Sequence, residues 1–253
     1  MSKTHLTYGY LLDPQHKVTI NLIGAGGTGS QVLSALTRID RGLKALGHTG
    51  IHVRLFDHDA VSEANVGRQL FSPMDIGMNK AVSSITRINR FFGLEWEAHP
   101  VTYSSESATA NIIITCIDSA EGRITIKKQI DEFEAMTQHV EPHYKQLYWL
   151  DFGNGRVTGQ VVLGTIFKTQ KKKPGEYLPS ITDLHDLTVI DEKEQGPSCS
   201  LAEAIAKQDL FINPSLAYLG CDILWELFAY GKIKKHGLYL NLETMQTRPI
   251  LIN

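Results

Sequence analysis

The stretch Val18-Thr-Ile-Asn-Leu-Ile-Gly24-Ala-Gly-Gly-Thr-Gly29-Ser30 decides the fold of this chain. Its first six residues are mostly β-branched or aliphatic, which predicts a strand, and four glycines follow within the next six positions. Beyond the glycines, apolar residues recur at the spacing of one helix face, at Val32, Leu33, Leu36 and Ile39. Strand, glycine loop and helix in this order form a G-x-G-x-x-G turn of the kind found in α/β folds.

The glycines of this loop predict a phosphate-binding site. Residues without a side chain let backbone N–H groups approach an anion closely, and the N-terminus of the following helix favours negative charge there. The residues expected to contribute are Gly24, Gly26, Gly27 and Gly29. A glycine-rich turn that binds nothing is the alternative interpretation of the motif when it is taken alone.

The next part of the chain alternates strands with helices. Ile51–Phe56 has the period of two of a strand, and residues 111–117 are continuously apolar, as in a fully buried strand. Further strands are expected near 97–103 and 146–150, and a helix at about 78–92. The alternation predicts an α/β fold with a Rossmann-like, mostly parallel sheet flanked by helices.

The C-terminal half predicts a β-rich extension to this sheet. Residues 155–167 are rich in strand formers, and segments 237–242 and 248–252 are typical of a terminal hairpin. We expect one domain, 1–253, with a nucleotide-binding core at 15–150. A mobile crossover-type loop is predicted at 168–197, because that stretch has little apolar periodicity, and a helical and hairpin part at 198–253.

Composition excludes several classes of protein. Charged residues make up 21% of the 253 positions and hydrophobic residues 42%, which is ordinary for a packed core and argues against disorder. The formal net charge of −2 gives no basic excess, so we expect no nucleic-acid partner. No secretory leader or membrane-spanning apolar run is apparent, and we expect a cytoplasmic protein without a membrane partner.

Charged and polar residues follow the second predicted strand. Asp57 ends that strand, where ribose hydroxyls lie in dinucleotide-binding folds, although it follows Gly24 by 33 residues, more than the usual spacing. Arg68 and Lys80 come next, and a triphosphate needs such cations more than an ordinary dehydrogenase ligand does. Asn65 and Gln69 accompany them, which argues against Arg68 being a solvated surface cation.

These residues carry a resemblance to a known family. The quoted motifs are Gly24-x-Gly-Gly-x-Gly-Ser30, Asp57-x-Asp59-x-Val61-x-x-x-Asn65-x-x-Arg68-Gln69, Gly77-x-x-Lys80 and Thr115-Cys-x-Asp118-Ser. Over about residues 15–130 the chain resembles the ThiF/MoeB/HesA family of ubiquitin-activating-type adenylyltransferases. The later Pro197-Ser-Cys-Ser and Gln208-Asp-Leu-Phe-Ile-Asn213 segments resemble the ThiF-related proteins of bacterial PRTRC gene cassettes.

The resemblance implies a reaction and a set of roles. It implies that the C-terminal carboxylate of a small ubiquitin-like, β-grasp protein is adenylated by ATP with Mg²⁺, and that pyrophosphate leaves. It further implies that Asp57 holds the ribose, that Asp118 ligates Mg²⁺, and that the phosphates are contacted by Asn65, Arg68, Gln69 and Lys80. Asp59 is a weaker binding-site hypothesis than Asp57, and a helix N-cap is the alternative role for Asp118.

The cysteines separate this chain from many relatives. Only Cys116, Cys199 and Cys221 are present, and no two form a C-x-x-C pair, so we expect no structural zinc. Cys199 follows the predicted loop at a predicted helix start, where a thiol is activated, and is our candidate nucleophile for a thioester. Cys116 and Cys221 lie in buried-looking elements, and simple packing is the alternative for Cys199 as well.

The resemblance also implies a homodimer, since the apolar helix around 216–228 could cover a partner. No arginine occurs in residues 1–37, so a trans arginine from that segment is not expected. Two other functions stay open on the sequence. One is an NAD(P)-binding Rossmann oxidoreductase, and the other is a non-catalytic scaffold that binds a ubiquitin-like protein.

Overall fold

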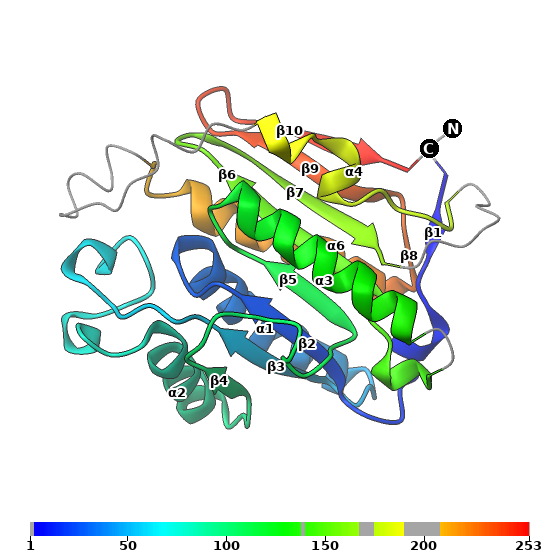
Figure 1. The fold of residues 1–253 in the computed structure, drawn as a ribbon, viewed down its shortest axis with the longest axis horizontal. Helices are drawn as coiled ribbons and strands as arrows, with labels where there is room; N and C mark the ends of the chain where they lie inside the picture. Colours follow the sequence, from blue (N-terminus) through cyan, green and yellow to red (C-terminus); the bar gives the residue numbers. More distant parts are fainter. Residues whose placement is uncertain (1–2, 138–139, 167–174, 190–207, 253) are drawn as a thin grey trace.

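A single mixed β-sheet of eight strands forms the centre of the molecule (Figure 1). The computed structural model describes residues 3–137, 140–166, 175–189 and 208–252. The strands of this sheet are β2 (Val18–Ile23), β3 (Ile51–Phe56), β4 (Glu97–His99), β5 (Ile112–Thr115), β6 (Tyr148–Asn154), β7 (Thr158–Thr165), β9 (Lys235–Asn241) and β10 (Gln246–Leu251). A separate two-stranded antiparallel ladder joins β1 (His5–Leu6) to β8 (Lys232–Ile233).

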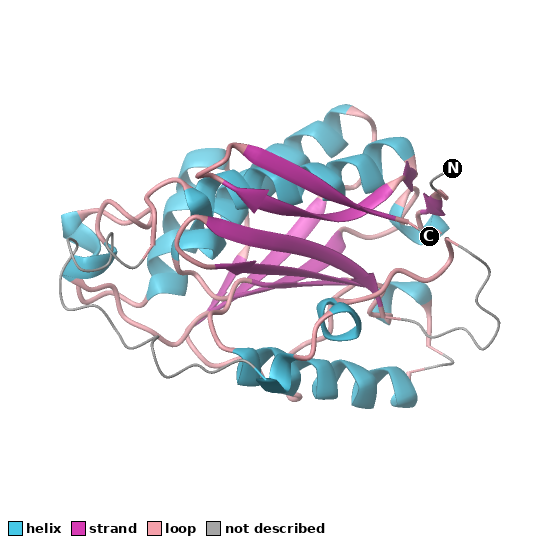
Figure 2. Cartoon of the chain, turned by 90° about the horizontal axis from the view of Figure 1, so that it is seen from above, coloured by secondary structure: helices cyan, strands magenta, loops and turns pink. Residues whose placement is uncertain are grey.

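The helices occupy both faces of the sheet. They are α1 (Gly27–Ala45), α2 (Lys80–Phe92), α3 (Ala120–Met136), the one-turn α4 (Ile181–Leu184) and α6 (Ile212–Tyr230). Short 3₁₀ turns are η1 (Gly9–Leu11), η2 (Glu63–Asn65), η3 (Pro73–Asp75), η4 (Pro142–Tyr144) and η5 (Leu187–Val189). Seen edge-on in Figure 2, the strands lie between two helical layers.

The sheet order explains where a ligand can bind. Its strands run in the order β10-β9-β7-β6-β5-β2-β3-β4, and the five from β6 to β4 are parallel. From β2 the chain proceeds to β3 on one side, while β5 lies on the other side. The carboxyl ends of β2 and β5 therefore form a topological switch point, where open α/β sheets bind ligands.

Alternation along the strands divides the core into two. In β5, Ile112 and Ile114 belong to the cluster that contains side chains of α1, α2 and α6, whereas Ile113 faces the cluster that contains Ile126 and Ile130 of α3. Successive strand residues point to opposite faces, so a strand buried on both sides reads as a continuous apolar run. The prediction of a fully buried strand at this position is confirmed, with shorter bounds.

Side-chain caps fix the starts of α2 and α3. The Asn79 side chain accepts a hydrogen bond from the Val82 N–H at the start of α2, and Gly93 ends that helix in the left-handed conformation, at φ 65°. The Ser119 side chain accepts from the Gly122 N–H at the start of α3. Because a cap satisfies free N–H groups of the first turn, each helix begins at a defined residue.

The Rossmann-like α/β fold with its β-rich C-terminal extension is confirmed. The strands β7, β9 and β10 extend the parallel part of the sheet in antiparallel pairing, and β9 and β10 form the predicted hairpin. Within the predicted loop at 168–197, the described residues 175–189 include α4, and Leu178 and Ile181 are buried. The other residues of that loop, and residues 198–207 of the predicted helical and hairpin part, lie outside the described residues.

The apolar helix α6 is buried inside its own chain. Leu216, Leu224 and Leu227 are fully buried, and the helix contacts α1 and the strands β6, β7 and β9. The apolar sequence of this helix predicts a surface that could cover a partner. These side chains pack inside their own chain instead, so they do not support dimerisation.

Among the described residues, none of the helices combines the length and the apolar character that crossing a bilayer requires.

Candidate functional site

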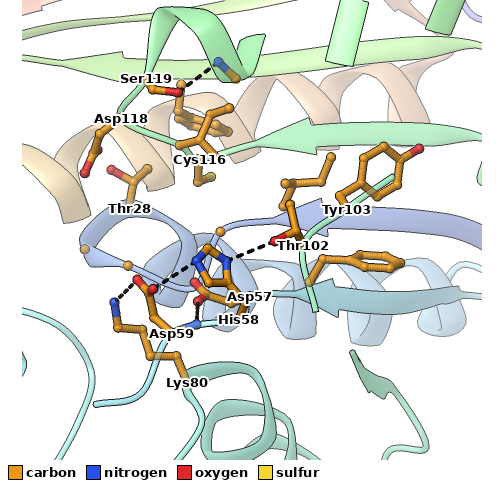
Figure 3. A pocket seen from close by; sticks show the side chains of 18 of the residues that line it. Thr28, Asp57, His58, Asp59, Lys80, Thr102, Tyr103, Cys116, Asp118 and Ser119 are labelled. Atoms are coloured by element: carbon orange, nitrogen blue, oxygen red, sulfur yellow. Dashed lines mark hydrogen bonds and ion pairs between the residues drawn. The ribbon is translucent and has the colours of Figure 1, made fainter. Parts of the chain in front are cut away.

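A pocket of about 620 Å³ opens at the switch point, over the carboxyl ends of β2, β3 and β5 (Figure 3). Its size falls in the range of about 300–1,000 Å³ that is usual for small-molecule sites. The glycine loop forms one part of its wall, the segment after β3 a second, and the segment after β5 a third. The pocket also reaches Gln208 and Asn213, which come from the C-terminal half of the chain.

Glycine is required at different positions of the loop for different structural reasons. Gly24 has φ +94°, and a Cβ there would lie 2.5 Å from the Cys116 carbonyl oxygen. A Cβ on Gly29 would lie 1.9 Å from the Gly24 carbonyl oxygen, so Gly29 allows α1 to pack closely on the loop. Gly24, Gly26 and Gly27 line the pocket, whereas Gly29 does not. The loop thus presents backbone to the pocket, and phosphate binding there stays a prediction.

Asp57 fixes the neighbouring backbone as well as lining the pocket. One carboxylate oxygen, Oδ2, accepts from the Ala25 N–H of the glycine loop at 2.6 Å, and Oδ1 accepts from the Asp59 N–H at 2.9 Å. The carboxylate therefore ties the end of β3 to the end of β2. Each oxygen has a further lone pair, so Asp57 can also accept from a ligand hydroxyl.

Lys80 and Asp59 form an ion pair at the pocket wall, with 2.9 Å between Nζ and Oδ2 (Figure 3). Burial pushes the pKa of Asp59 upward, but the hydrogen bond and charge of Lys80 outweigh it, and the net shift is downward. Lys80 is only 8% exposed, although it is the first residue of α2. Its ammonium group is held in place before any ligand arrives, which reduces the entropic cost of binding an anion.

Arg68 lines the same pocket, and its guanidinium is anchored from a distant segment. Its Nη1 donates to Oε1 of Gln208 at 2.6 Å, while its Nε is buried without a hydrogen-bond partner among the described residues. The neighbouring Gln69 is 6% exposed, and its Oε1 likewise has no partner there. Buried polar atoms without hydrogen-bond partners are costly, and both residues line the pocket.

Asn65 does not line the pocket. Its Oδ1 accepts from the backbone N–H of Ser62 at 2.9 Å and from the Ser62 hydroxyl at 3.2 Å, which closes a capping box at η2. The structure therefore gives Asn65 a local role in shaping the turn that leads to Arg68. A direct phosphate contact from Asn65 stays a prediction from the family resemblance.

Asp118 stands on the third wall, shortly after the end of β5, with an exposed side chain (Figure 3). The cap of α3 is Ser119 rather than Asp118, so the alternative role of Asp118 as a helix N-cap is not observed. An exposed carboxylate at this edge, opposite the glycine loop, is a suitable oxygen ligand for Mg²⁺ bound to phosphates. Ligation of Mg²⁺ by Asp118 stays a prediction from the family resemblance.

The Arg123 side chain donates hydrogen bonds to the backbone of that wall. Its Nη2 donates to the carbonyl oxygens of Ile117 at 2.6 Å and Phe152 at 2.8 Å, and its Nε donates to Asp151 at 2.9 Å. Burial raises the pKa of Asp151, and the charge of Arg123 partly offsets this effect. Sequence reasoning missed this pair, because each residue alone resembles an ordinary member of a helix or strand.

The cysteines divide between the core and the part of the chain that is not described. Cys116 lines the pocket but is only 9% exposed, and burial raises the pKa of its thiol well above the ordinary value. Burial raises the pKa of Cys221 to about 12. Neither thiol is activated, which agrees with the packing roles predicted for both. Cys199, the predicted nucleophile, lies outside the described residues.

Several pocket residues were not recognised as site residues from the sequence, and four polar ones among them are joined by hydrogen bonds. Thr28 is the second residue of α1, and Asn154 ends β6. Gln208 precedes α6, and Asn213 is the second residue of that helix. Gln208 and Asn213 bound the segment that resembles the PRTRC proteins, and that resemblance was the only signal available for them.

The fold and the site together define a Rossmann-like α/β protein with a glycine-loop pocket at its switch point. The sequence model of the ThiF family matches residues 13–230. The chain belongs to the ThiF family.

Curated relatives are similar over part of their length. The chain is 29% identical over 132 residues to ubiquitin-like modifier-activating enzyme 5 of Drosophila willistoni, covering 45% of this chain and 30% of that protein. It is 25% identical over 178 residues to the Xenopus laevis enzyme of the same name, covering 62% and 38%. The matches thus span about a third of the length of these relatives.

Solved structures share the fold at low identity. Escherichia coli MccB matches with a TM-score of 0.59 and 16% identity, covering 96% of this chain and 63% of that chain. PaaA matches with a TM-score of 0.59 and 17% identity, covering 94% and 64%. Both comparisons support the architecture described above.

Proposed function

We propose that this protein adenylates the C-terminal carboxylate of a small ubiquitin-like protein, with ATP as co-substrate and Mg²⁺ as cofactor. The observation that carries the proposal is the meeting of Arg68, Lys80 and Asp118 around the glycine loop in one pocket. Two cations and a carboxylate suit a metal-bound triphosphate, because they offset its charge and hold its metal.

The proposed step is a displacement at phosphorus. A carboxylate oxygen of the protein substrate forms a bond to the α-phosphorus of ATP, the bond from that phosphorus to the bridging oxygen breaks, and pyrophosphate leaves with the electron pair. An acyl-adenylate remains. The chain has little covalent chemistry to do, so its contribution is positioning and charge stabilisation. Bound Mg²⁺ would neutralise phosphate charge during this step.

Each wall of the pocket has a proposed task. Asp57 accepts from a ribose hydroxyl, while Gly26 and Gly27 offer backbone to the phosphates. Lys80 supplies a buried point charge, and Arg68 supplies the Nε–H that has no partner within the described residues. Gln69 completes this wall, and Asp59 holds Lys80 rather than the ligand.

The comparisons support the same class of reaction. The curated relatives are named as activating enzymes of a ubiquitin-like modifier. MccB has also been solved with ATP, in a structure that matches with a TM-score of 0.56 and 17% identity, covering 96% of this chain and 65% of that chain. These names belong to those proteins, and they enter here as support for a proposal about this chain.

Exchange of radiolabelled pyrophosphate into ATP tests the proposal. We expect exchange that depends on Mg²⁺ and on a small ubiquitin-like protein with an intact C-terminus, and that disappears when its last residue is amidated. Reduction or oxidation of a nicotinamide cofactor without exchange would favour the oxidoreductase. Tight binding of the ubiquitin-like protein with neither activity would favour the scaffold.

Several finer predictions belong to the same proposal. A homodimer, a cytoplasmic location and kinship with the PRTRC cassettes are inferred from the family resemblance. After adenylation, the Cys199 thiolate would attack the acyl carbon and displace AMP, which gives a thioester. Sulfur at the sulfide level would displace AMP in the same way, which gives a thiocarboxylate. The small protein that co-purifies with this chain would identify the partner.

A further inference from the structure

A chain of hydrogen bonds crosses the pocket wall and joins residues that are far apart in sequence. The Thr28 hydroxyl donates to Oδ1 of Asn213 at 2.8 Å, and Nδ2 of Asn213 donates to Oε1 of Gln208 at 2.9 Å. The same Gln208 oxygen accepts from Nη1 of Arg68 at 2.6 Å. All four residues line the pocket.

The positive charge of Arg68 decides which group donates and which accepts in each of these hydrogen bonds. A guanidinium has only donors, so Gln208 must turn its carbonyl oxygen toward Arg68. That oxygen also faces Asn213, so the Asn213 side chain must donate an amide N–H to it and direct its own oxygen the other way. The Asn213 oxygen consequently accepts from Thr28 and, at 3.1 Å, from Nδ2 of Asn154. Each amide has one orientation that satisfies its neighbours.

Asn213 occupies the centre of this chain and is rigidly enclosed. It is 1% exposed, at the second position of α6, and α6 packs along α1. A Cβ on Gly27 would lie 2.5 Å from Nδ2 of Asn213. Gly27 of the phosphate-binding motif is therefore also the residue that admits Asn213 to the loop.

We propose that Asn213 is a positioning residue for the nucleotide, acting through Gln208 on Arg68. It orients the Gln208 oxygen that holds the Arg68 guanidinium at the pocket wall, and it anchors Thr28 at the start of α1. The inference rests on the proposed function, in which Arg68 meets the phosphates. It adds that the C-terminal half of the chain prepares the phosphate site.

Binding measurements separate this role from a merely structural one. We expect Asn213→Ala to weaken ATP binding by roughly tenfold, the scale of one lost hydrogen bond to a charged group. Adenosine lacks phosphates, so its competition with a fluorescent ATP analogue should be unchanged. General damage to the pocket would weaken ATP and adenosine together, and that result would overturn the proposal.

A double-mutant cycle identifies the residue through which Asn213 acts. In an Arg68→Ala background, Asn213→Ala should add little further loss of ATP affinity, because the group it positions is gone. Lys80→Ala provides the matched background. Lys80 is paired with Asp59, and within the described residues its ammonium group makes no hydrogen bond to Thr28, Asn213, Gln208 or Arg68, so the two losses should add. Additive losses with Arg68 would overturn the proposal.

A second substitution covers the case in which Asn213→Ala does not fold. Gln208→Glu keeps the shape of the side chain but places a carboxylate against Arg68, which then competes with phosphate for the guanidinium. ATP affinity should fall by roughly tenfold or more while adenosine affinity stays the same. Unchanged ATP affinity in this variant would contradict the proposed positioning of Arg68 through Gln208.

The readouts also separate this inference from the proposed function. Wild-type protein that binds ATP but exchanges no pyrophosphate would contradict adenylation, while coupling of Asn213 to Arg68 would still be measured by binding. Pyrophosphate exchange in the wild type, together with additive losses of ATP affinity in Asn213→Ala and Arg68→Ala, would contradict only the positioning role of Asn213. Wild-type protein that does not bind ATP would contradict both.

Discussion

Arg123 and Asp151 form a buried ion pair, 2.9 Å between Nε and Oδ1, directly beneath the segment that carries Asp118. Asp151 is fully buried and also accepts from the Thr115 hydroxyl, whose oxygen accepts in turn from the Trp149 indole N–H. The pair thus joins β5, β6 and α3. Because Arg123 also donates to the backbone of this wall, the position of Asp118 depends on a largely buried charge pair.

Replacing one partner of this ion pair should lower the free energy of unfolding more than replacing both partners. We expect Arg123→Met to lower the free energy of unfolding by about 3–5 kcal/mol, because it leaves the Asp151 carboxylate buried without its partner. The double variant Arg123→Met, Asp151→Leu should recover most of that loss. Urea unfolding at pH 7 measures both. A double variant no more stable than the single one would contradict this account.

Lys80 is expected to be essential for exchange but not for folding. Lys80→Ala should lower pyrophosphate exchange by roughly 10²-fold or more, since it removes a preorganised charge next to the reacting phosphates. Lys128→Ala is the matched control, because Lys128 is 78% exposed and pairs only loosely with Glu132 at 3.9 Å. Equal exchange by both variants would remove Lys80 from the proposed mechanism.

Asp118 should set the requirement for Mg²⁺. Asp118→Asn keeps the size of the side chain but loses the negative charge, so the Mg²⁺ concentration for half-maximal exchange should rise roughly tenfold or more. Binding of ATP in EDTA should stay close to the wild-type value. If the Mg²⁺ dependence does not move, another group holds the metal.

His5 should make stability fall in mildly acidic solution. Burial lowers its pKa below 6.5, and its ring nitrogens contact the Gly175 carbonyl oxygen and the Tyr148 hydroxyl. Below pH 6.5 the unfolded chain takes up a proton that the folded chain refuses, so stability is present above that pH and declines as pH drops.

Substitution of His5 checks that assignment. In His5→Phe, the decrease in unfolding free energy between pH 7 and pH 5 should be shallower than in the wild type. It should not vanish, because burial also lowers the pKa of His236. Chemical unfolding at a series of pH values gives the slope. Identical slopes in the two proteins would exclude His5 as the titrating group.

Cys199 should matter only after adenylation. We expect Cys199→Ala to retain full pyrophosphate exchange but to lose any thiol-labile adduct with the ubiquitin-like protein, detected by intact-protein mass spectrometry. Cys221→Ala is a suitable comparison, because its thiol is buried. Undiminished adduct or transfer in Cys199→Ala would exclude the thioester.

Local patterns predicted the fold and much of the pocket. The glycine loop, Asp57 and Asp118 each follow the end of a strand, and parallel topology brings strand ends together without further information. Lys80 could be placed because a helix pattern begins beside it. These predictions depended on residues close in sequence to the elements that position them.

Other features depended on contacts that no local pattern encodes. Gln208 meets Arg68 across 140 positions, and Asn213 meets Thr28 across 185. The apolar character of α6 was evident, but only the packed structure shows that α1 and the sheet cover it. Asn65 matched a motif position, although its side chain closes the turn at Ser62.

The pairing of β1 with β8 has a consequence for how the gene could be rearranged. His5 lies opposite Ile233, and the Lys3 N–H donates to the Ile252 carbonyl oxygen at 3.0 Å, so the two ends of the described chain meet (Figure 1). A short linker between them would turn the polypeptide into a ring. Circular permutants opened at surface turns should then keep the order of the strands while changing the order in which they are synthesised.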